Sequence, residues 1–300
     1  LTTLSLHDAL PISLDTKHAG GKLVLPGGED HRELVLTVPG ISPWGENDHT
    51  HYGDTGEGRA IGWLRMNTRN DAQGRRVLFI EEVQSKRGQE GRKSGFDVDG
   101  SLPAGYAVRE HGGKFGIYYD NIRGLSGWSI PPTRTSREAA ISYFREMHPD
   151  LLVPPAPFLS DSNNRATNAY ITLLMKKAIA YAAETGHDAV AWTTGEQQAD
   201  RYDLKIGGEW ARAMYGDATG RNSDGRPSLI AQAISEIGKR VGGLDVKPSS
   251  IGSLGIQPSI EITEALRARV LGEGFPLFNR NAAQQHASQS DRAVYSMAAE

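Results

Sequence analysis

The sequence predicts a mixed α/β or α+β fold, in which one twisted sheet contains an interrupted parallel strand–helix–strand unit. Three observations lead to this prediction. A strand-like run at residues 77–84 begins the unit, a helix-like run at 167–185 crosses over, and a second strand at 188–194 closes it. A helical crossover of this kind is nearly always right-handed and places its two strands parallel. The segment between the first strand and the helix is long enough to hold an inserted module.

The three parts of this unit show different patterns. Residues 77–84 follow a turn-forming NDAQG segment and are rich in β-branched and aromatic side chains, as strands are. Residues 188–194 contain an unbroken Ala-Val-Ala-Trp run, which is typical of a strand buried on both faces. Residues 167–185 repeat apolar side chains every three to four positions, and Gly186 is placed to end the helix.

Further elements are expected on either side of the unit. Alternating apolar and polar residues predict strands at 34–38 and 60–66. A stripe of aliphatic side chains predicts a helix at 228–241. A last strand is expected at 259–262, followed by a short capped helix. These elements extend the sheet and supply helices to cover it.

The inserted module is expected at residues 97–147. His111, Gly112 and Gly113 separate two strand-like runs and suit the positive φ angles of a hairpin turn. Thr135 and Glu138 have the spacing of a capping box before a helix. We therefore predict a small β-hairpin and helix module that is separate from the main sheet.

The two ends of the chain differ in character from the rest. Residues 1–13, LTTLSLHDALPIS, closely resemble a translated sequencing-adapter sequence, and we expect them to lie outside the fold. Residues 279–300 are rich in Ala, Gln and Ser without apolar periodicity, as in a linker or disordered tail. The main α/β domain is therefore expected at 14–96 and 148–278.

Composition excludes several classes of site. The chain has no cysteine, which excludes disulfides, thiolate nucleophiles and Cys-ligated metal centres. Its net charge of −3 gives no electrostatic footprint for nucleic acid, which is not expected as a partner. No apolar run approaches the ~20 residues that span a bilayer, so no membrane is expected either. Asp48, His49, His51 and Asp54 form only a weak metal candidate, and no metal site is predicted.

A first polar motif lies at the carboxyl end of the first parallel strand. Side chains alternate along a strand, so Glu82 and Gln84 should share one face while Glu81 and Ser85 share the other. Adjacent carboxylates here could form a general acid/base pair or hold a divalent cation. The alternative is a set of solvated residues leaving a strand.

The glycine-rich, basic segment 86–95 follows this motif. Its glycines and four basic residues could wrap a phosphate. A flexible basic loop is the simpler interpretation, because the segment is neither a Walker loop nor a dinucleotide fingerprint.

A second polar motif, at residues 193–202, follows the second parallel strand. Gly195 permits a tight turn, and a helix that begins near Glu196 would place Gln197 and Arg201 on one face. Such a helix N-terminus at the end of a strand is a natural anion site. The alternative is an ordinary capped helix, with Arg201 in a structural ion pair.

Parallel strands end at the same edge of a sheet, where ligands of open α/β sheets bind. We therefore predict that both motifs line one pocket, with Glu82 near Arg201. The catalytic candidates in this pocket are Glu81, Glu82, Gln84 and Arg201, and the ligand-binding candidates are Ser85, Thr194, Gly195, Gln197 and Tyr202.

Four segments stand out by their order and spacing: LFIEEVQS, VPPAPF, LLMKKAIAYAAETGHDAVAWTTGEQQADRYDL and LRARVLGEGFPLF. Together they resemble a recurrent domain of the large polyvalent proteins of bacteriophages, prophages and conjugative elements. The resemblance covers most of residues 32–278. The family usually continues Gln-Ser into Asp-Trp, where this chain has Lys86 and Arg87. If that Asp is catalytic in the family, this copy is impaired.

This resemblance implies a domain of a larger polypeptide with neighbouring domains. It implies a place in the host cytoplasm or the virion, and a role in host takeover or counter-defence through a small-molecule or nucleotide-like ligand. The order of strand, basic segment, helix and strand also resembles the acyl-CoA site of N-acetyltransferases, where backbone amides after the central strand hold a pyrophosphate. That likeness implies a group transferase with a CoA- or nucleotide-like ligand, although ~50 inserted residues exceed the usual connection. The alternative is a non-catalytic binding or structural module.

Overall fold

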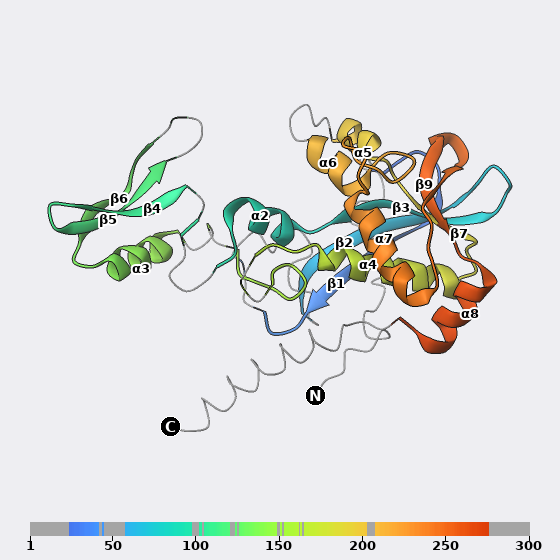
Figure 1. Cartoon of the computed structure of the whole chain (residues 1–300), viewed down its shortest axis with the longest axis horizontal. Coiled ribbons are helices and arrows are strands. Elements are labelled where there is room, and N and C mark those ends of the chain that lie inside the picture. Colours follow the sequence, from blue (N-terminus) through green and yellow to red (C-terminus); the bar gives the residue numbers. More distant parts are fainter. Residues whose placement is uncertain are drawn as a thin grey trace, which may run out of the picture.

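The computed structural model describes residues 24–41, 44, 58–97, 102–103, 105–120, 124, 126–148, 151, 153–161, 163, 165–202 and 208–275. The terminal segments 1–13 and 279–300 and the metal candidate at 48–54 lie outside these residues. The largest element is a six-stranded mixed sheet (Figure 1). Its strands are, in spatial order, β1 (Glu29–Val38), β2 (Arg59–Asn70), β3 (Arg76–Gln84), β7 (Ala189–Trp192), β9 (Ile256–Glu261) and β8 (Lys247–Ser250).

A second, three-stranded sheet forms the inserted module. It contains β4 (Tyr106–His111), β5 (Lys114–Asp120) and β6 (Ser126–Arg134). The helices of the described chain are α2 (Lys86–Ser94), α3 (Arg137–Met147), α4 (Ala169–Glu184), α5 (Gly195–Arg201), α6 (Gly208–Tyr215), α7 (Leu229–Val241) and α8 (Glu264–Glu273), with a 3-10 turn η1 (Gly252–Leu254).

The predicted parallel unit is confirmed. β3 and β7 pair in parallel over four positions, residues 77–80 with residues 189–192, and every other pair of neighbours in the main sheet is antiparallel. Helix α4 is the crossover between them, and Gly186 ends it with a φ of 73°. Helices α4, α7 and α8 lie over the sheet (Figure 1), and their apolar side chains share one core with one of its faces. The chain therefore has the mixed fold that the sequence predicts.

The inserted module matches its prediction except at one cap. Gly112 and Gly113 have φ angles of 59° and 71° and join β4 to β5 in a hairpin. The three strands form their own sheet, which α3 covers, and none of them joins the main sheet. The predicted capping residue Thr135 is wrong by one position, because Ser136 accepts the Ala139 N–H with its side chain.

The segment predicted as a flexible basic loop is helix α2. The Ser85 hydroxyl caps this helix by accepting the Gly88 N–H, and it donates to Ile61 O at 2.5 Å. Gly91 faces the core, where an added Cβ would lie 2.2 Å from Phe96 Cζ. The loop prediction failed because glycine here serves close packing of a helix against an aromatic ring, not a turn.

A β-bulge interrupts the ladder between β2 and β3. Arg65 pairs with Glu82, but the next residue, Met66, pairs with Ile80, which leaves Glu81 as the extra residue. Ile80 and Val83 both belong to the main core, so the two glutamates between them face the opposite side of the sheet. The prediction that Glu81 and Glu82 lie on different faces is therefore wrong, since the bulge shifts the alternation by one residue.

His187 lies buried in the turn between α4 and β7. Its Nε2 lies 3.0 Å from the Thr68 hydroxyl and its Nδ1 lies 2.8 Å from the Thr185 hydroxyl. Burial, reinforced by the nearby positive charge of Arg76, lowers the pKa of this imidazole to about 4. The ring is therefore neutral in the folded protein and links β2 to the end of α4.

We expect the free energy of unfolding to fall as the pH is lowered from 6.5 to about 4. In this window the unfolded chain binds a proton at residue 187 that the folded chain does not, so acid favours unfolding, and above it the effect vanishes. Urea midpoints should show a weaker pH dependence for His187→Gln. The exposed His111→Gln is the matched control and should follow the wild type. Parallel curves for all three proteins would contradict the assignment.

Candidate functional site

Strand β3 extends beyond β7 and leaves one of its edges without a neighbouring strand. The parallel pairing stops at Ile80 and Trp192, where Thr193 N–H donates to Ile80 O at 3.2 Å. β3 continues to Gln84, paired only with β2. The backbone groups of β3 that point away from β2 need other partners over this last stretch.

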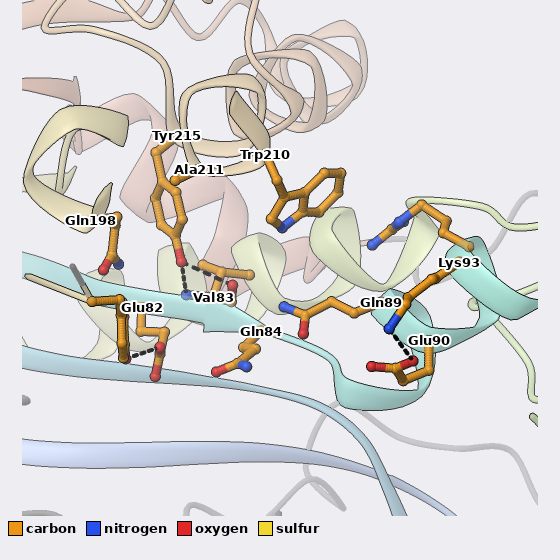
Figure 2. A pocket seen from close by; sticks show the side chains of 12 residues that line it. Glu82, Val83, Gln84, Gln89, Glu90, Lys93, Gln198, Trp210, Ala211 and Tyr215 are labelled. Atoms are coloured by element: carbon orange, nitrogen blue, oxygen red, sulfur yellow. Dashed lines mark hydrogen bonds and ion pairs between the residues drawn. The ribbon is translucent and has the colours of Figure 1, made fainter. Parts of the chain in front are cut away.

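Side chains from α5 and α6 bond to this edge in place of a strand. Glu81 O accepts Gln198 Nε2 at 2.5 Å and Arg201 Nη1 at 3.2 Å. The Tyr215 hydroxyl accepts Val83 N–H at 2.8 Å and donates to Val83 O at 2.9 Å (Figure 2). The two helices that follow β7 thus complete the hydrogen bonding of β3.

A pocket of about 630 Å³ lies beside this edge, between β3, α2, the end of α5 and α6. This volume is within the range of small-molecule sites. Figure 2 shows the pocket with Tyr215 above β3, Trp210 over its middle and the side chains of α2 at its far end. The lining residues are Glu82, Val83, Gln84, Gln89, Glu90, Arg92, Lys93, Gln198, Tyr202, Trp210, Ala211 and Tyr215.

The two predicted motifs meet at this edge, and three of their candidate residues line the pocket. These are Glu82 and Gln84 from the first motif and Tyr202 from the second. The other six candidates do not line it: Glu81, Ser85, Thr194, Gly195, Gln197 and Arg201. No sequence signal indicated that Trp210 and Tyr215 would line the pocket. Helix α6 contains no recognisable motif, and only the folded chain brings it close to β3.

Glu81 is the centre of a buried ionic cluster. Its Oε1 accepts Asn67 Nδ2 at 2.7 Å and Arg69 Nη2 at 3.3 Å, while Arg201 Nη2 lies 3.6 Å from its Oε2. The side chains of Glu81, Arg69 and Arg201 are at most 5% exposed, and burial lowers the pKa of Arg69. The prediction that Glu82 pairs with Arg201 is therefore wrong. The bulge turns both glutamates toward α5, where Arg201 pairs with Glu81, while Glu82 pairs with Arg65.

Glu82 forms a second cluster at one end of the pocket. Arg65 Nη2 lies 2.8 Å from Glu82 Oε2 and donates to the Tyr202 hydroxyl at 3.0 Å. The Tyr202 hydroxyl donates in turn to Glu82 Oε1. Burial, and after it the charge of Glu82, raise the pKa of Tyr202 to about 12, so the phenol is protonated at neutral pH. The pocket thus has a carboxylate and a phenol in direct contact.

The remaining candidates of the second motif build the start of α5. The Thr194 side chain accepts Gln197 N–H at 3.3 Å, and Gln197 Oε1 accepts Thr194 N–H at 3.1 Å, which forms a capping box. Gly195 permits α5 to touch α6, because an added Cβ would lie 2.4 Å from Arg212 Cα. The turn predicted to bind an anion therefore holds its own capping residues and the acidic Glu196. A ligand role for these residues stays a prediction.

The end of the pocket formed by α2 is electropositive. Of the two acids that line the pocket, Glu82 pairs with Arg65 outside it, and Glu90 pairs with Lys86 at 2.9 Å outside it and with Lys93 at 3.8 Å on its rim. Arg92 and Lys93 add two positive charges. The guanidinium of Arg92 lies 4.3 Å from the centre of the Trp210 ring, and the Lys93 side chain is 79% exposed at the rim. This end suits an anionic group.

One buried acceptor in the pocket wall is not satisfied. Gln198 is 2% exposed, and its Nε2 donates to β3. Its Oε1 has no hydrogen-bond partner within the described part of the chain. A buried amide oxygen without a partner is costly, by about 1–3 kcal/mol. A ligand donor in the pocket would satisfy it.

Within the described residues, no group of three or more His, Asp or Glu side chains is arranged to hold a metal ion. Among the helices described above, none combines the length and apolarity needed to cross a membrane. The chain matches no protein-family model, no curated protein and no solved structure. Function is therefore inferred from the geometry of the pocket and the strand edge beside it.

Proposed function

We propose that this chain is a group-transfer domain that binds a CoA-type thioester in the pocket between β3, α2 and α6. The observation that carries this proposal is the edge of β3, where one hydroxyl, from Tyr215, meets both backbone groups of Val83. Strand edges bind extended ligands through their backbone groups. The thioester carbonyl oxygen and an amide N–H of the CoA arm can replace that hydroxyl on the same N–H and C=O.

The polarity of the pocket matches the order of the chemical groups along a CoA thioester. Glu82 and Tyr202 lie at one end, and the middle has the uncharged amides of Gln84 and Gln89 with Trp210 over them (Figure 2). Arg92 and Lys93 supply positive charge at the other end. An acyl thioester, an uncharged arm and a phosphate-bearing nucleotide meet complementary groups in that sequence. The unsatisfied Gln198 Oε1 adds an acceptor for an amide N–H of the arm.

In acyl transfer the acceptor attacks the thioester carbonyl, the C–S bond breaks, and the thiol is released as the acceptor loses a proton. Val83 N–H would donate to the carbonyl oxygen once Tyr215 gives up that bond, which stabilises the developing negative charge. Glu82 and Tyr202 are the proton-exchanging pair nearest this point. The raised pKa of Tyr202 keeps it a proton donor, and the Glu82 carboxylate is the acceptor.

The Glu81 cluster favours a structural interpretation of part of the predicted site. Glu81 and Arg201 are buried outside the pocket and bond to each other and to β2 and β3. Their arrangement holds α5 against the sheet and so positions Gln198 and Tyr202. A role in phage host takeover or counter-defence stays a prediction that rests on the sequence resemblance.

Acetyl-CoA should stabilise the protein, by about 2.7 kcal/mol at a concentration 100-fold above its Kd. Lys93→Glu should weaken binding about tenfold, since it reverses a charge where the phosphates would lie. Lys239→Glu is the matched control, because Lys239 is also highly exposed, on α7, and does not line the pocket. Thermal shifts and titration calorimetry measure both variants. Equal affinity for both would contradict the placement of the phosphates.

Thiol release provides the catalytic test. The chain has no cysteine, so a thiol-reactive dye reports only CoA set free when acetyl-CoA is mixed with a panel of primary amines. Glu82→Gln should abolish release while thioester binding persists. Binding without release from any acceptor would favour the non-catalytic binding module. A melting temperature unchanged by any CoA derivative at millimolar concentration would refute the proposed function altogether.

A further inference from the structure

The side-chain hydrogen-bond donors at the β3 end of the pocket already have partners. Gln198 Nε2 and the Tyr215 hydroxyl each donate to a backbone oxygen of β3, at 2.5 Å and 2.9 Å (Figure 2). The Tyr202 hydroxyl donates to Glu82 Oε1. A ligand group at this end therefore meets side chains that accept hydrogen bonds, while their donors are bound elsewhere.

Two acceptors at this end have lone pairs to spare. Gln198 is 2% exposed, and its Oε1 has no hydrogen-bond partner within the described chain. The amide cannot be reversed without setting two carbonyl oxygens against each other, because its Nε2 is bound to Glu81 O. The Glu82 carboxylate accepts from Tyr202 and Arg65, which leaves part of its capacity for four hydrogen bonds. An amino group has N–H bonds for both acceptors, and Gln198 Oε1 can also accept from the CoA arm.

The charges around the pocket exclude a cationic amine. The charged residues that line it are two acids and two bases. Each acid also pairs with a base outside the lining. Arg65 Nη2 lies 2.8 Å from Glu82, and Lys86 Nζ lies 2.9 Å from Glu90, so the whole set carries a charge of +2. An ammonium group would enter without an unpaired counter-ion, which is unfavourable. The amine must therefore be weakly basic, so that it is uncharged at neutral pH.

Three aromatic side chains line the pocket beside these acceptors: Tyr202, Trp210 and Tyr215. Aromatic rings attract each other in offset or edge-to-face arrangements. An amino group attached directly to an aromatic ring is weakly basic, because the ring delocalises the nitrogen lone pair. One class of ligand thus supplies both the neutral donor and the flat ring that the pocket suits.

We infer that the acyl acceptor is an aromatic primary amine, and the transfer step of this inference rests on the proposed function. The amine nitrogen attacks the thioester carbonyl, a C–N bond forms and the C–S bond breaks. The nitrogen loses a proton to Glu82 while Tyr202 protonates the departing sulfur. Glu82 then returns a proton to Tyr202 along their hydrogen bond. The products are an N-acyl aromatic amine and a free thiol.

Three ring compounds of similar size test the amine site without acetyl-CoA. The amino group of p-toluidine is uncharged at neutral pH, whereas its isomer benzylamine is an ammonium ion, and p-cresol has a single O–H in place of the amino group. In titration calorimetry, p-toluidine should bind about tenfold more tightly than benzylamine. It should also bind more tightly than p-cresol, which can serve only one of the two acceptors.

Two variants should reverse the preference for the neutral amine. Arg65→Met leaves the Glu82 carboxylate without its counter-ion, so benzylamine should become the tighter ligand. Gln198→Glu adds a carboxylate to the pocket wall and should have the same effect, which covers the case that Arg65→Met does not fold. Arg269→Met on α8 is the matched control, since its side chain is 44% exposed and does not line the pocket. It should keep the wild-type preference. Damage to the fold alone would weaken both amines without reversing their order.

Equal affinity of the wild type for p-toluidine and benzylamine would overturn the inference. So would a p-cresol affinity equal to that of p-toluidine, no binding of any of the three at millimolar concentration, or no reversal in either variant. If acetyl-CoA still bound in those cases, the thioester proposal would stand and only its acceptor would be wrong. Selective binding of p-toluidine without binding of acetyl-CoA would support the amine site and refute the thioester.

Discussion

Replacing Glu81 by Ala should lower the free energy of unfolding by about 3–5 kcal/mol. The carboxylate is 2% exposed and is the shared counter-ion of Arg69 and Arg201. Its removal leaves two buried guanidinium groups without compensating charge and takes an acceptor from Asn67. Because α5 is held to β3 through this cluster, its first effect should be to loosen α5. Urea unfolding followed by circular dichroism measures the loss.

Two variants make this result interpretable. Glu261→Ala removes an exposed carboxylate that lies 3.4 Å from Arg75, an ion pair worth about 0–1 kcal/mol. Glu81→Gln keeps the shape of the side chain, and its loss of unfolding free energy should lie between those of Glu81→Ala and Glu261→Ala. A loss in Glu81→Ala no larger than that in Glu261→Ala would mean that the cluster does not stabilise the fold. Full stability with lost thiol release in Glu81→Gln would return Glu81 to the catalytic residues.

Gly195→Ala should cost about 1–3 kcal/mol and should also weaken ligand binding. The added methyl group would lie 2.4 Å from Arg212 Cα and 2.8 Å from Ala211 O, both of which are backbone atoms. Helix α6 must therefore move away from α5. Trp210, Ala211 and Tyr215 lie on α6 and line the pocket, so the same movement changes the binding site. Melting temperature and acetyl-CoA affinity should fall together.

Gly272→Ala is the control for this substitution. Gly272 lies within α8, and an added Cβ would meet nothing within 4 Å. Alanine has a better helix propensity than glycine, so this variant should be more stable than wild type by about 0.5–1 kcal/mol. A wild-type melting temperature for Gly195→Ala would show that α5 and α6 are not in close contact.

The central architecture could be predicted because its signals are local and strong. The buried Ala-Val-Ala-Trp strand, the helix before it and the glycine between them follow standard patterns, and together they require a parallel neighbour. Helix α2 could not be predicted in this way. Gly88 and Gly91 lower its helix propensity, and close packing accounts for them: an added Cβ would lie 2.9 Å from Ser85 Oγ at Gly88 and 2.2 Å from Phe96 Cζ at Gly91.

The sequence could predict where the candidate site lies on the sheet, but not which of its side chains pair with each other. Both motifs reach one edge of the sheet, as the carboxyl ends of parallel strands must. The bulge at Glu81 has no sequence signature, and it changes which glutamate meets Arg201. The contribution of Tyr215 depends on how far β3 continues past the four-residue pairing with β7, a length that emerges only from the assembled sheet.

The short parallel pairing also bears on how the chain tolerates an insertion. Residues 77–80 pair with residues 189–192 at the centre of the sheet. Forming this pair closes a loop of the chain that contains the whole inserted module. The entropy lost in closing a flexible loop grows only with the logarithm of its length, by about 0.6 kcal/mol for each doubling. The antiparallel strands β1 to β3 can form early from local contacts, while β7 must wait for a distant encounter. Adding or removing a module between them therefore alters the search for the native pairing far more than it alters the stability of the finished sheet.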